Sequence, residues 1–170
     1  MHTCCCRFCG ASLRATMVDL GMSPLANAYL TVEQLHQMEP FYPLRVHVCE
    51  RCWLVQLEAF TAPESIFSDY AYFSSYSDSW LQHAKAYVEM VVERFSLTTA
   101  SQVIEIASND GYLLQYFVAL GIPVLGIEPA ENIAAVAQQR GIATLVRFFG
   151  EESAKQLVAH GMPADLVVGN

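Results

Sequence analysis

Apolar and polar positions alternate most regularly in the second half of the chain, where short apolar runs are separated by segments with helical spacing. The short runs predict buried strands, and apolar positions three and four residues apart predict helices. Gly121 and Gly141 follow the first two helical segments, where glycine commonly ends a helix. The expected elements, strand and helix in turn, are 103–106, 112–120, 124–127, 131–140, 143–146, 151–160 and 166–168. This alternation predicts a parallel sheet with right-handed crossovers.

The first half of the chain has a different pattern. Up to about residue 60, prolines and glycines separate short apolar pieces such as 44–48 and 54–57, which predicts a small β-rich module at residues 1–60. Residues 61–98 form a bridge that contains one helix, because its apolar positions fall on one helical face. Ser77 or Asp78 is the expected N-cap of this helix. Residues 99–170 then carry the predicted parallel sheet.

Four parallel strands make up half of a doubly wound sheet, and the last of them ends next to Asn170. The composition is 54% hydrophobic and 15% charged, which is apolar for a self-sufficient domain of 170 residues. We therefore expect the chain to be the N-terminal part of a longer protein, whose remaining C-terminal part covers some of this apolar surface.

Charge and hydropathy exclude two classes of partner. The net charge is −8 and the nine lysines and arginines are scattered, so the electrostatic attraction that drives nucleic-acid binding is missing. No apolar run approaches the roughly 18–20 residues of a membrane span, and the N-terminus has no apolar signal core. We expect a cytoplasmic protein that binds neither nucleic acid nor membrane. Thiols stay reduced in the cytosol, so clustered cysteines there indicate metal binding.

Two C-x2-C pairs predict such a metal site: Cys6, Cys9, Cys49 and Cys52. Each pair places two thiolates on one tight turn, and two such turns make a tetrahedral sulfur site suited to zinc. All four positions are filled by protein, so the zinc is expected to be structural and coupled to folding. The alternatives are unliganded cysteines, competition between Cys4 and Cys6, or a contribution from His47.

A second candidate site lies where the first predicted strand of the sheet turns into a helix. The pattern there is E-x-A-x-N-x-G, formed by Glu105, Ala107, Asn109 and Gly111. A pyrophosphate needs glycines for close backbone approach, whereas S-adenosylmethionine has no phosphate and tolerates Ala107 and Asn109. Glu128 ends the next strand, where a carboxylate accepts hydrogen bonds from ribose hydroxyls. Taken alone, Glu128 would equally well be a solvated carboxylate at a strand end, but its register with Glu105 favours a functional role.

Aromatic residues stand near both ends of this predicted site. Phe148 and Phe149 follow the third strand, where they would either contact an adenine ring or pack in the core. The aromatic and hydroxyl run at residues 70–77 would either cover the cofactor or simply lead into the bridging helix.

Taken together, the chain resembles the sugar C-methyltransferases of deoxysugar biosynthesis, including antibiotic biosynthesis. These proteins have a zinc-binding module, an S-adenosylmethionine domain and a C-terminal domain, in that order. The matching stretches are CRFCG, DLGMSPLANAYL, YPLRVHVCERC, LVQLE, YAYFSSYSDSW, EIASNDGYLLQYF, GIEPAENIA, FFG and ADLVVGN. The resemblance implies an α/β fold: a small β-rich zinc-binding module, a helical bridge, and the first half of a Rossmann-like S-adenosylmethionine methyltransferase sheet.

The resemblance also implies roles for individual residues. The four paired cysteines would bind zinc. The residues expected around the methyl donor are Tyr72, Ser75, Tyr76, Glu105, Ala107, Ser108, Asn109, Gly111, Glu128, Pro129, Phe149 and Asn170. Trp53 departs from the family pattern, which has glycine after the second cysteine, so a less regular turn is expected at Cys52.

The implied reaction of the whole protein is methylation at C-3 of a nucleotide-linked 4-keto-6-deoxyhexose through an enolate. The family's catalytic base lies in a Tyr-His-Glu-His stretch, expected after Asn170, so this part of the protein is expected to be inactive alone. The alternatives are a methyltransferase with another small-molecule acceptor and a non-catalytic zinc-ribbon interaction module. A nicotinamide-dependent oxidoreductase is disfavoured because the pyrophosphate glycines are missing.

Overall fold

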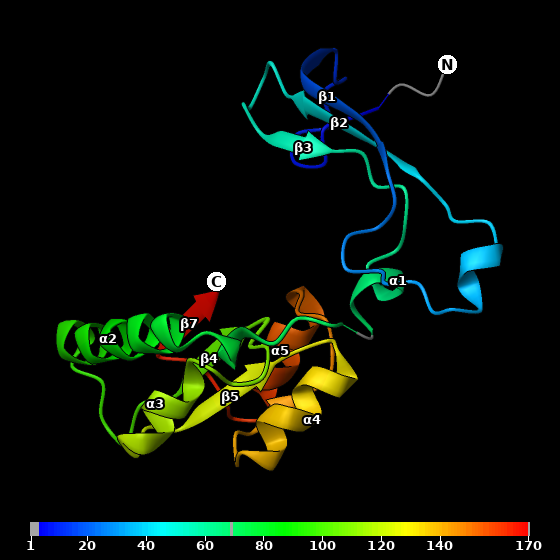
Figure 1. Ribbon diagram of the computed structural model, residues 1–170. Helices are drawn as coiled ribbons and strands as arrows, with labels where there is room; N and C mark the ends of the chain where they lie inside the picture. Colours follow the sequence, from blue (N-terminus) through cyan, green and yellow to red (C-terminus); the bar gives the residue numbers. More distant parts are fainter. Residues whose placement is uncertain (1–3, 69, 170) are drawn as a thin grey trace. The chain divides into compact units, whose positions relative to one another are not determined.

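The computed structural model describes residues 4–68 and 70–169, which divide into two compact units at residues 1–66 and 67–170 (Figure 1). The α/β class predicted from the sequence is confirmed: one unit contains an antiparallel sheet and the other a parallel sheet. Within the described residues, no helix combines the length and the apolar character needed to cross a membrane.

The first unit is built on a three-stranded antiparallel sheet in the order β1-β2-β3. Strands β2 (Tyr42–Val48) and β3 (Val55–Leu57) occur where apolar pieces were predicted. Strand β1 (Ala15–Ser23) was not predicted, because most of its residues are exposed and its apolar positions do not alternate cleanly. The short helices are η1 (Gln34–His36) and α1 (Glu64–Phe67).

The second unit contains a four-stranded parallel sheet in the order β6-β5-β4-β7. Its strands are β4 (Val103–Ile106), β5 (Val124–Ile127), β6 (Thr144–Leu145) and β7 (Leu166–Gly169). Its helices are η2 (Ser74–Tyr76), α2 (Asp78–Phe95), α3 (Leu114–Ala119), α4 (Glu131–Gln139) and α5 (Glu151–Ala159). The predicted alternation of strands and helices is therefore confirmed.

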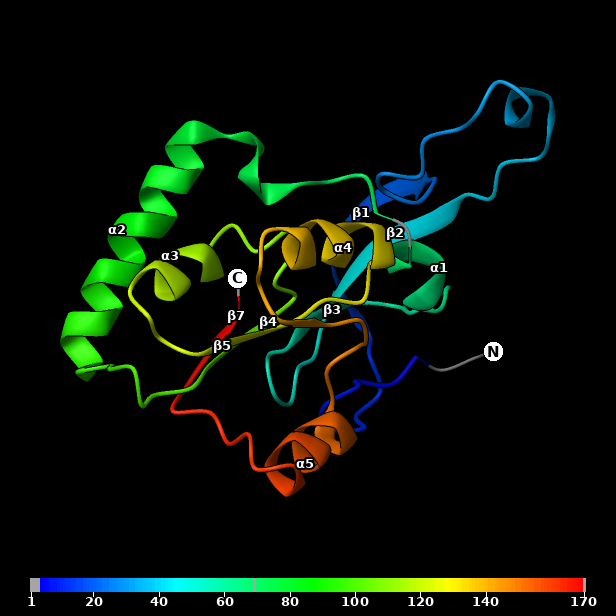
Figure 2. The same cartoon turned by 90° about the horizontal axis from the view of Figure 1, so that it is seen from below.

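The helices of this unit cover both faces of the sheet, as Figure 2 shows: α3 and α4 lie on one side and α5 on the other. The larger core cluster joins α2, α3 and the sheet, and includes the fully buried Val88, Leu114 and Phe117. A smaller cluster packs Leu157 of α5 against the opposite face. Ser77 caps α2 by accepting a hydrogen bond from the Trp80 backbone amide, which confirms one of the two predicted caps.

Two predicted boundaries differ from the structure. Helix α3 begins at Leu114 rather than at residue 112, because Ala107, Asn109 and Gly111 all adopt positive φ and prolong the loop after β4. Strand β6 covers only Thr144–Leu145 of the expected 143–146. The long loop after β4 matters for function because it lies at the carboxyl edge of the parallel sheet, where α/β proteins bind ligands.

Candidate metal centre and cofactor pocket

The structure brings the four predicted metal ligands together in the first unit. The sulfur atoms of Cys6, Cys9, Cys49 and Cys52 all lie within 4.8 Å of one another. The Cys6–Cys52 and Cys9–Cys49 sulfur distances are both 3.6 Å. Two sulfurs bound to one tetrahedral zinc at about 2.3 Å are about 3.8 Å apart, so the cluster has the size that zinc requires.

The two turns that carry these cysteines have the same backbone geometry. Gly10 and Trp53 follow the second cysteine of each pair, and both have left-handed φ, +71° and +64°. Their amides donate to the carbonyls of Cys6 and Cys49, at 2.9 and 2.8 Å. The less regular turn expected at Cys52 is therefore wrong: Trp53 adopts the conformation that glycine favours elsewhere, and its ring is exposed.

Gln56 on β3 connects the first turn to the sheet. Its Nε2 donates to the Cys6 sulfur at 3.2 Å, and its Oε1 accepts from the Arg7 amide at 3.0 Å. The Cys9 backbone amide and the Gln56 side chain lower the pKa of the Cys6 thiol to about 6, which favours the thiolate that binds metal. Sequence reasoning missed Gln56; the only signal was a polar residue within an apolar strand.

Two residues considered as alternative ligands lie outside this cluster. His47 is buried on β2, and its Nε2 is 3.6 Å from a carboxylate oxygen of Glu58. Cys4 is half-buried, and burial raises the pKa of its thiol, with a further contribution from Glu58. Neither residue belongs to the group of four sulfurs that surround one point.

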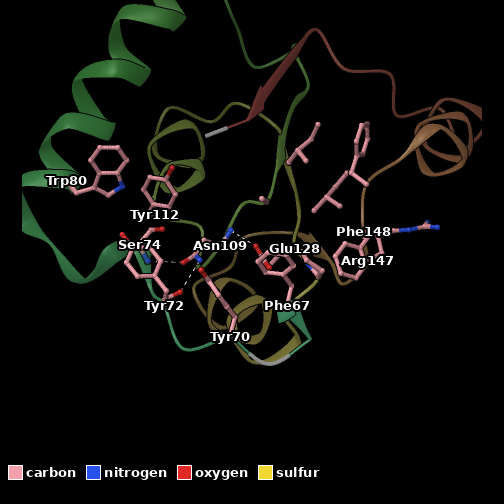
Figure 3. Close-up of a pocket in the computed structure, with 15 residues that line it drawn as sticks. Phe67, Tyr70, Tyr72, Ser74, Trp80, Asn109, Tyr112, Glu128, Arg147 and Phe148 are labelled. Carbon is pink, nitrogen blue, oxygen red and sulfur yellow. Dashed lines mark hydrogen bonds between the residues drawn. The ribbon is translucent and has the colours of Figure 1, made fainter. Parts of the chain in front are cut away.

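The second unit contains a cavity of about 510 Å³ at the carboxyl ends of β4 and β5 (Figure 3). Six of the predicted cofactor residues line it: Tyr72, Ala107, Asn109, Glu128, Pro129 and Phe149. Aromatic rings form much of the rest of its wall. A pocket of this size, mostly apolar with a few polar groups, is typical of small-molecule binding sites.

Glu128 is the acidic group of this pocket and is only 6% exposed. Its Oε2 accepts a hydrogen bond from the Asn109 amide and its Oε1 accepts one from the Ala130 amide, both at 2.9 Å. These bonds hold the loop after β4 against the loop after β5. Each carboxylate oxygen has a further lone pair, so the same group can still accept hydrogen bonds from a ligand.

Glu105 begins the predicted motif, but it does not line the pocket. The residue is fully buried on β4, and neither carboxyl oxygen has a hydrogen-bond partner among the described residues. Burial, together with the charges of Glu128 and Asp110, raises the pKa of Glu105 to about 9. The side chain is therefore neutral at pH 7 and lies beneath the loop as an uncharged carboxyl group.

Ser108 and Gly111 also pack within the loop rather than line the pocket. A Cβ atom on Gly126 would lie 2.4 Å from the Ser108 hydroxyl oxygen, so that hydroxyl packs directly against β5. At Gly111 a Cβ atom would lie 2.2 Å from Cδ1 of Ile142, and its φ is +77°. Glycine is needed there because the start of α3 packs closely against the residues after α4.

The remaining predicted residues have different positions. Ser75 donates from its hydroxyl to Asp110, which is buried and also pairs with Arg140 at 3.2 Å. The side chain of Tyr76 is almost fully exposed. Neither Ser75 nor Tyr76 lines the pocket, and Asn170 lies outside the described residues.

Several lining residues were not predicted as cofactor ligands. Ile106 and Ile127 sit at the strand ends, whereas Trp80 and Tyr112 stack with ring centres 6.1 Å apart. Trp80 was assigned only to the apolar face of a helix, because periodicity shows that a residue faces inward but not what it contacts. Phe67 and Arg147 were not predicted either. Phe148 was expected beside an adenine ring or in the core, and Tyr70 and Ser74 belong to the run that was expected to cover the cofactor or lead into the helix.

Comparison with known proteins concerns the first unit and the relatives of the whole chain. Residues 6–67 match the protein family described as "Putative zinc binding domain". Over 165 residues, the chain is 38% identical to "C-methyltransferase NovU" from Streptomyces niveus. The match covers 96% of this chain and 39% of that protein, so the chain spans well under half of its relative's length.

Among solved structures, the "Crystal structure of MccD protein" shares 19% identity, with 51% of this chain and 32% of that chain covered and a TM-score of 0.29. A similarity this low supports no conclusion about function. The 38% identity to the C-methyltransferase and the four-cysteine cluster are much stronger evidence of a relationship. The chain is therefore similar to a C-methyltransferase over part of that protein's length, and its residues 6–67, which contain the four-cysteine cluster, match a putative zinc-binding domain.

Proposed function

We propose that the full-length protein is an S-adenosylmethionine-dependent C-methyltransferase that acts on a nucleotide-linked 4-keto-6-deoxy sugar. In this proposal the first unit is a structural zinc module and the second unit binds the methyl donor. Methylation occurs at C-3 of the sugar, in deoxysugar and natural-product biosynthesis in the cytoplasm. The chain's similarity to a C-methyltransferase supports the reaction class, and the sugar acceptor follows from the resemblance found in the sequence.

The observation that carries the cofactor proposal is the position of Glu128. The carboxylate lines the pocket at the end of β5, beside the loop that follows β4. Two adjacent parallel strands thus present their carboxyl ends to one cavity, with an acidic acceptor on one side and backbone on the other. This arrangement is suited to a ribose, whose two hydroxyls donate hydrogen bonds.

The other walls of the pocket fit the rest of the cofactor. Phe148 and Phe149 supply apolar surface against which an adenine ring can pack. Tyr72, Trp80 and Tyr112 supply aromatic faces, which attract a sulfonium cation as they attract other ligand cations. In the loop after β4, Ala107 and Asn109 adopt left-handed conformations. These residues stand where a pyrophosphate would need glycines, so the loop suits a cofactor that has no phosphate.

When bound, the cofactor supplies an electrophilic methyl group. The chain's own residues orient it: Glu128 holds the ribose, and the aromatic walls exclude water from the reacting carbon. Orientation matters because methyl transfer to a carbanion requires the two reactants in contact and in line. The carbonyl of the sugar acidifies the neighbouring C–H group. A base whose pKa is near neutrality removes the proton from that carbon. We assign this base to none of the described residues.

Zinc takes no part in this reaction. Four protein sulfurs complete a tetrahedral site, so no position remains for water or substrate. Its proposed role is to hold the turns at Cys6 and Cys49 together in a unit whose apolar core is small.

Titration calorimetry on the full-length, zinc-loaded protein tests the cofactor proposal. We expect S-adenosylmethionine to bind and NAD⁺ not to bind. A preference for NAD⁺ would favour an oxidoreductase, and the absence of both would favour an interaction module.

Proton exchange tests the chemistry separately. In deuterated water, the full-length enzyme should incorporate deuterium at C-3 of a nucleotide-linked 4-keto-6-deoxy sugar even without the methyl donor. Methylation of an oxygen, with no exchange at carbon, would overturn the enolate route and point to a different small-molecule acceptor.

A further inference from the structure

The segment at residues 70–77, which we call the strap, forms one wall of the pocket without belonging to the sheet. Tyr70, Tyr72 and Ser74 line the cavity, and the only regular structure in the strap is the short helix η2. The described residues give the strap no strand partner. Its position therefore depends on side chains that reach it from the loop after β4 and from α4.

Amide side chains hold the strap at two points. Asn132 on α4 accepts from the Tyr70 amide at 3.2 Å and donates to the Tyr70 carbonyl at 2.8 Å. Asn109 accepts from the Ser74 amide at 2.9 Å and donates to the Tyr72 carbonyl at 3.1 Å. Each asparagine thus replaces a strand partner by offering one acceptor and one donor to the backbone.

A third contact comes from the residue after Asn109. Asp110 accepts from the backbone amide of Ser75 at 3.4 Å and also from its hydroxyl. Arg140 pairs with Asp110 at 3.2 Å and donates to the Ser75 hydroxyl at 3.1 Å. This contact secures the end of the strap next to α2, but it does not involve any residue that lines the pocket.

Asn109 differs from Asn132 and Asp110 because it also binds Glu128, the acidic group of the pocket. Its backbone amide donates to Glu128 at 2.9 Å, while its side chain holds the strap. Figure 3 shows Asn109 between Glu128 on one side and Tyr72 and Ser74 on the other. The residue is 9% exposed and has a φ of +50°, so both of its roles depend on one constrained conformation.

We propose that Asn109 is a positioning residue that couples the occupation of Glu128 by a nucleoside to the position of the strap over that nucleoside. The proposal rests on the proposed function, because it takes a ribose as the group that binds Glu128. A ligand that donates to Glu128 restrains the carboxylate, the carboxylate restrains the Asn109 amide, and the side chain of Asn109 restrains Tyr72 and Ser74. By reciprocity, a strap held in place strengthens ligand binding by the same factor.

Asn109→Gly in the full-length protein is the test. Glycine adopts a left-handed φ without strain and keeps the amide that binds Glu128, so the change removes the two hydrogen bonds to the strap together with the pocket surface of the Asn109 side chain. We expect S-adenosylmethionine and adenosine to bind at least about fivefold more weakly, as the loss of two ordinary hydrogen bonds implies. Ligand-induced protection of the amides at residues 72–75 from hydrogen exchange should also disappear.

Asn132→Ala is the matched control, because it removes the same two kinds of hydrogen bond from the strap, and the Asn132 side chain bonds to Tyr70 rather than to Glu128. It should speed exchange near Tyr70 with and without ligand, and leave the ligand-induced protection at 72–75 intact. Equal effects of the two variants on that protection would overturn the coupling, because Asn109 would then merely support the strap.

A second substitution covers the case in which Asn109→Gly does not fold. Asn109→Asp keeps the left-handed preference and the acceptor for Ser74 but loses the donor to Tyr72, so some protection at residue 74 should remain. Affinity and protection equal to wild type in the folded variant would overturn the proposal. If the wild-type protein bound adenosine but not S-adenosylmethionine, the proposed function alone would be overturned. If it bound neither ligand, the proposed function and the coupling through Asn109 would both be overturned.

Discussion

Each unit of this chain buries a cluster of acidic groups, but the two clusters avoid mutual repulsion in different ways. The first unit gathers four thiols around one point. The second gathers the buried carboxyl groups of Glu105, Asp110 and Glu128 in and around the loop after β4. The thiols are placed to share one metal ion, whereas backbone amides hold Glu128, Arg140 pairs with Asp110, and burial favours the protonated form of Glu105.

The surrounding cores match this difference. The first unit's core cluster of buried residues consists of Cys6, Leu13 and Cys49, so two of its three members are metal ligands. The second unit has a larger cluster of aliphatic and aromatic side chains shared by α2, α3 and the sheet. Under the proposed function, zinc would stabilise the first unit directly, whereas the second unit has an apolar core of its own.

The largest effect should come from breaking the metal centre. In Cys49→Ser, the first unit should lose zinc and unfold, because structural zinc contributes an apparent binding free energy of about 10–16 kcal/mol. The second unit should stay folded. Elemental analysis for zinc and hydrogen exchange of both units would measure this, with Cys5→Ser as control because Cys5 is exposed and outside the cluster. Full zinc occupancy in Cys49→Ser would contradict the assignment.

Glu105 should make the stability of the second unit depend on pH. Its pKa is about 9 in the fold and 4.5 ordinarily, so the stability that its neutral form provides is complete below about pH 4.5 and is lost as pH rises through 9. Glu105→Gln stays neutral, so it should match wild type near pH 4 and exceed it by up to about 5 kcal/mol at pH 8. Urea unfolding followed by hydrogen exchange of β4 and β5 would measure the difference.

The matched control is Glu89→Gln, which removes an exposed carboxylate from α2 and should leave the pH dependence unchanged. If Glu105→Gln kept the wild-type pH slope, Glu105 would be ionised in the fold. The proposed difference between the two units, a metal ion at the four thiols and a retained proton at Glu105, would then be wrong.

Glu128 should affect ligand binding as well as the two loops that it joins. Glu128→Ala removes a buried acceptor that we assign to the ribose, so S-adenosylmethionine should bind more weakly by about 1.5–3 kcal/mol, as for hydrogen bonds to charged groups. Calorimetry on the full-length protein measures this. The control is Glu131→Gln, which changes an exposed acidic residue in the first turn of α4. Unchanged affinity in Glu128→Ala would place the ribose elsewhere.

The smallest effect concerns the second zinc turn. Trp53→Gly should stabilise the zinc-loaded first unit by about 0.5–1 kcal/mol, because glycine adopts the left-handed conformation without the steric cost of a Cβ atom. Trp53→Ala keeps that Cβ atom and should give no such gain. Zinc retention against a competing chelator would report the change. An equal gain in both variants would attribute it to the exposed indole ring rather than to the backbone.

The sequence by itself was sufficient to predict those features that depend on residues close together in the chain. Two thiolates separated by two residues share one turn, so the spacing of the pairs at Cys6 and Cys49 was enough to predict the metal cluster. Apolar runs between helical segments likewise predicted the parallel sheet, because burial on both faces requires continuous apolar strands. The pocket position of Glu128 followed from its place at the end of a strand.

Only the tertiary structure decided which residues face the pocket and which lie behind it. Glu105 and Asn109 belong to one motif, yet one is buried beneath the loop and the other lines the cavity. Tyr72 and Tyr76 belong to one aromatic run, yet only Tyr72 reaches the pocket. The reason is physical: the direction of a side chain in a loop depends on left-handed residues and on hydrogen bonds to residues distant in sequence, such as those from Asn109 and Asn132 to the strap. Neither periodicity nor spacing records those contacts.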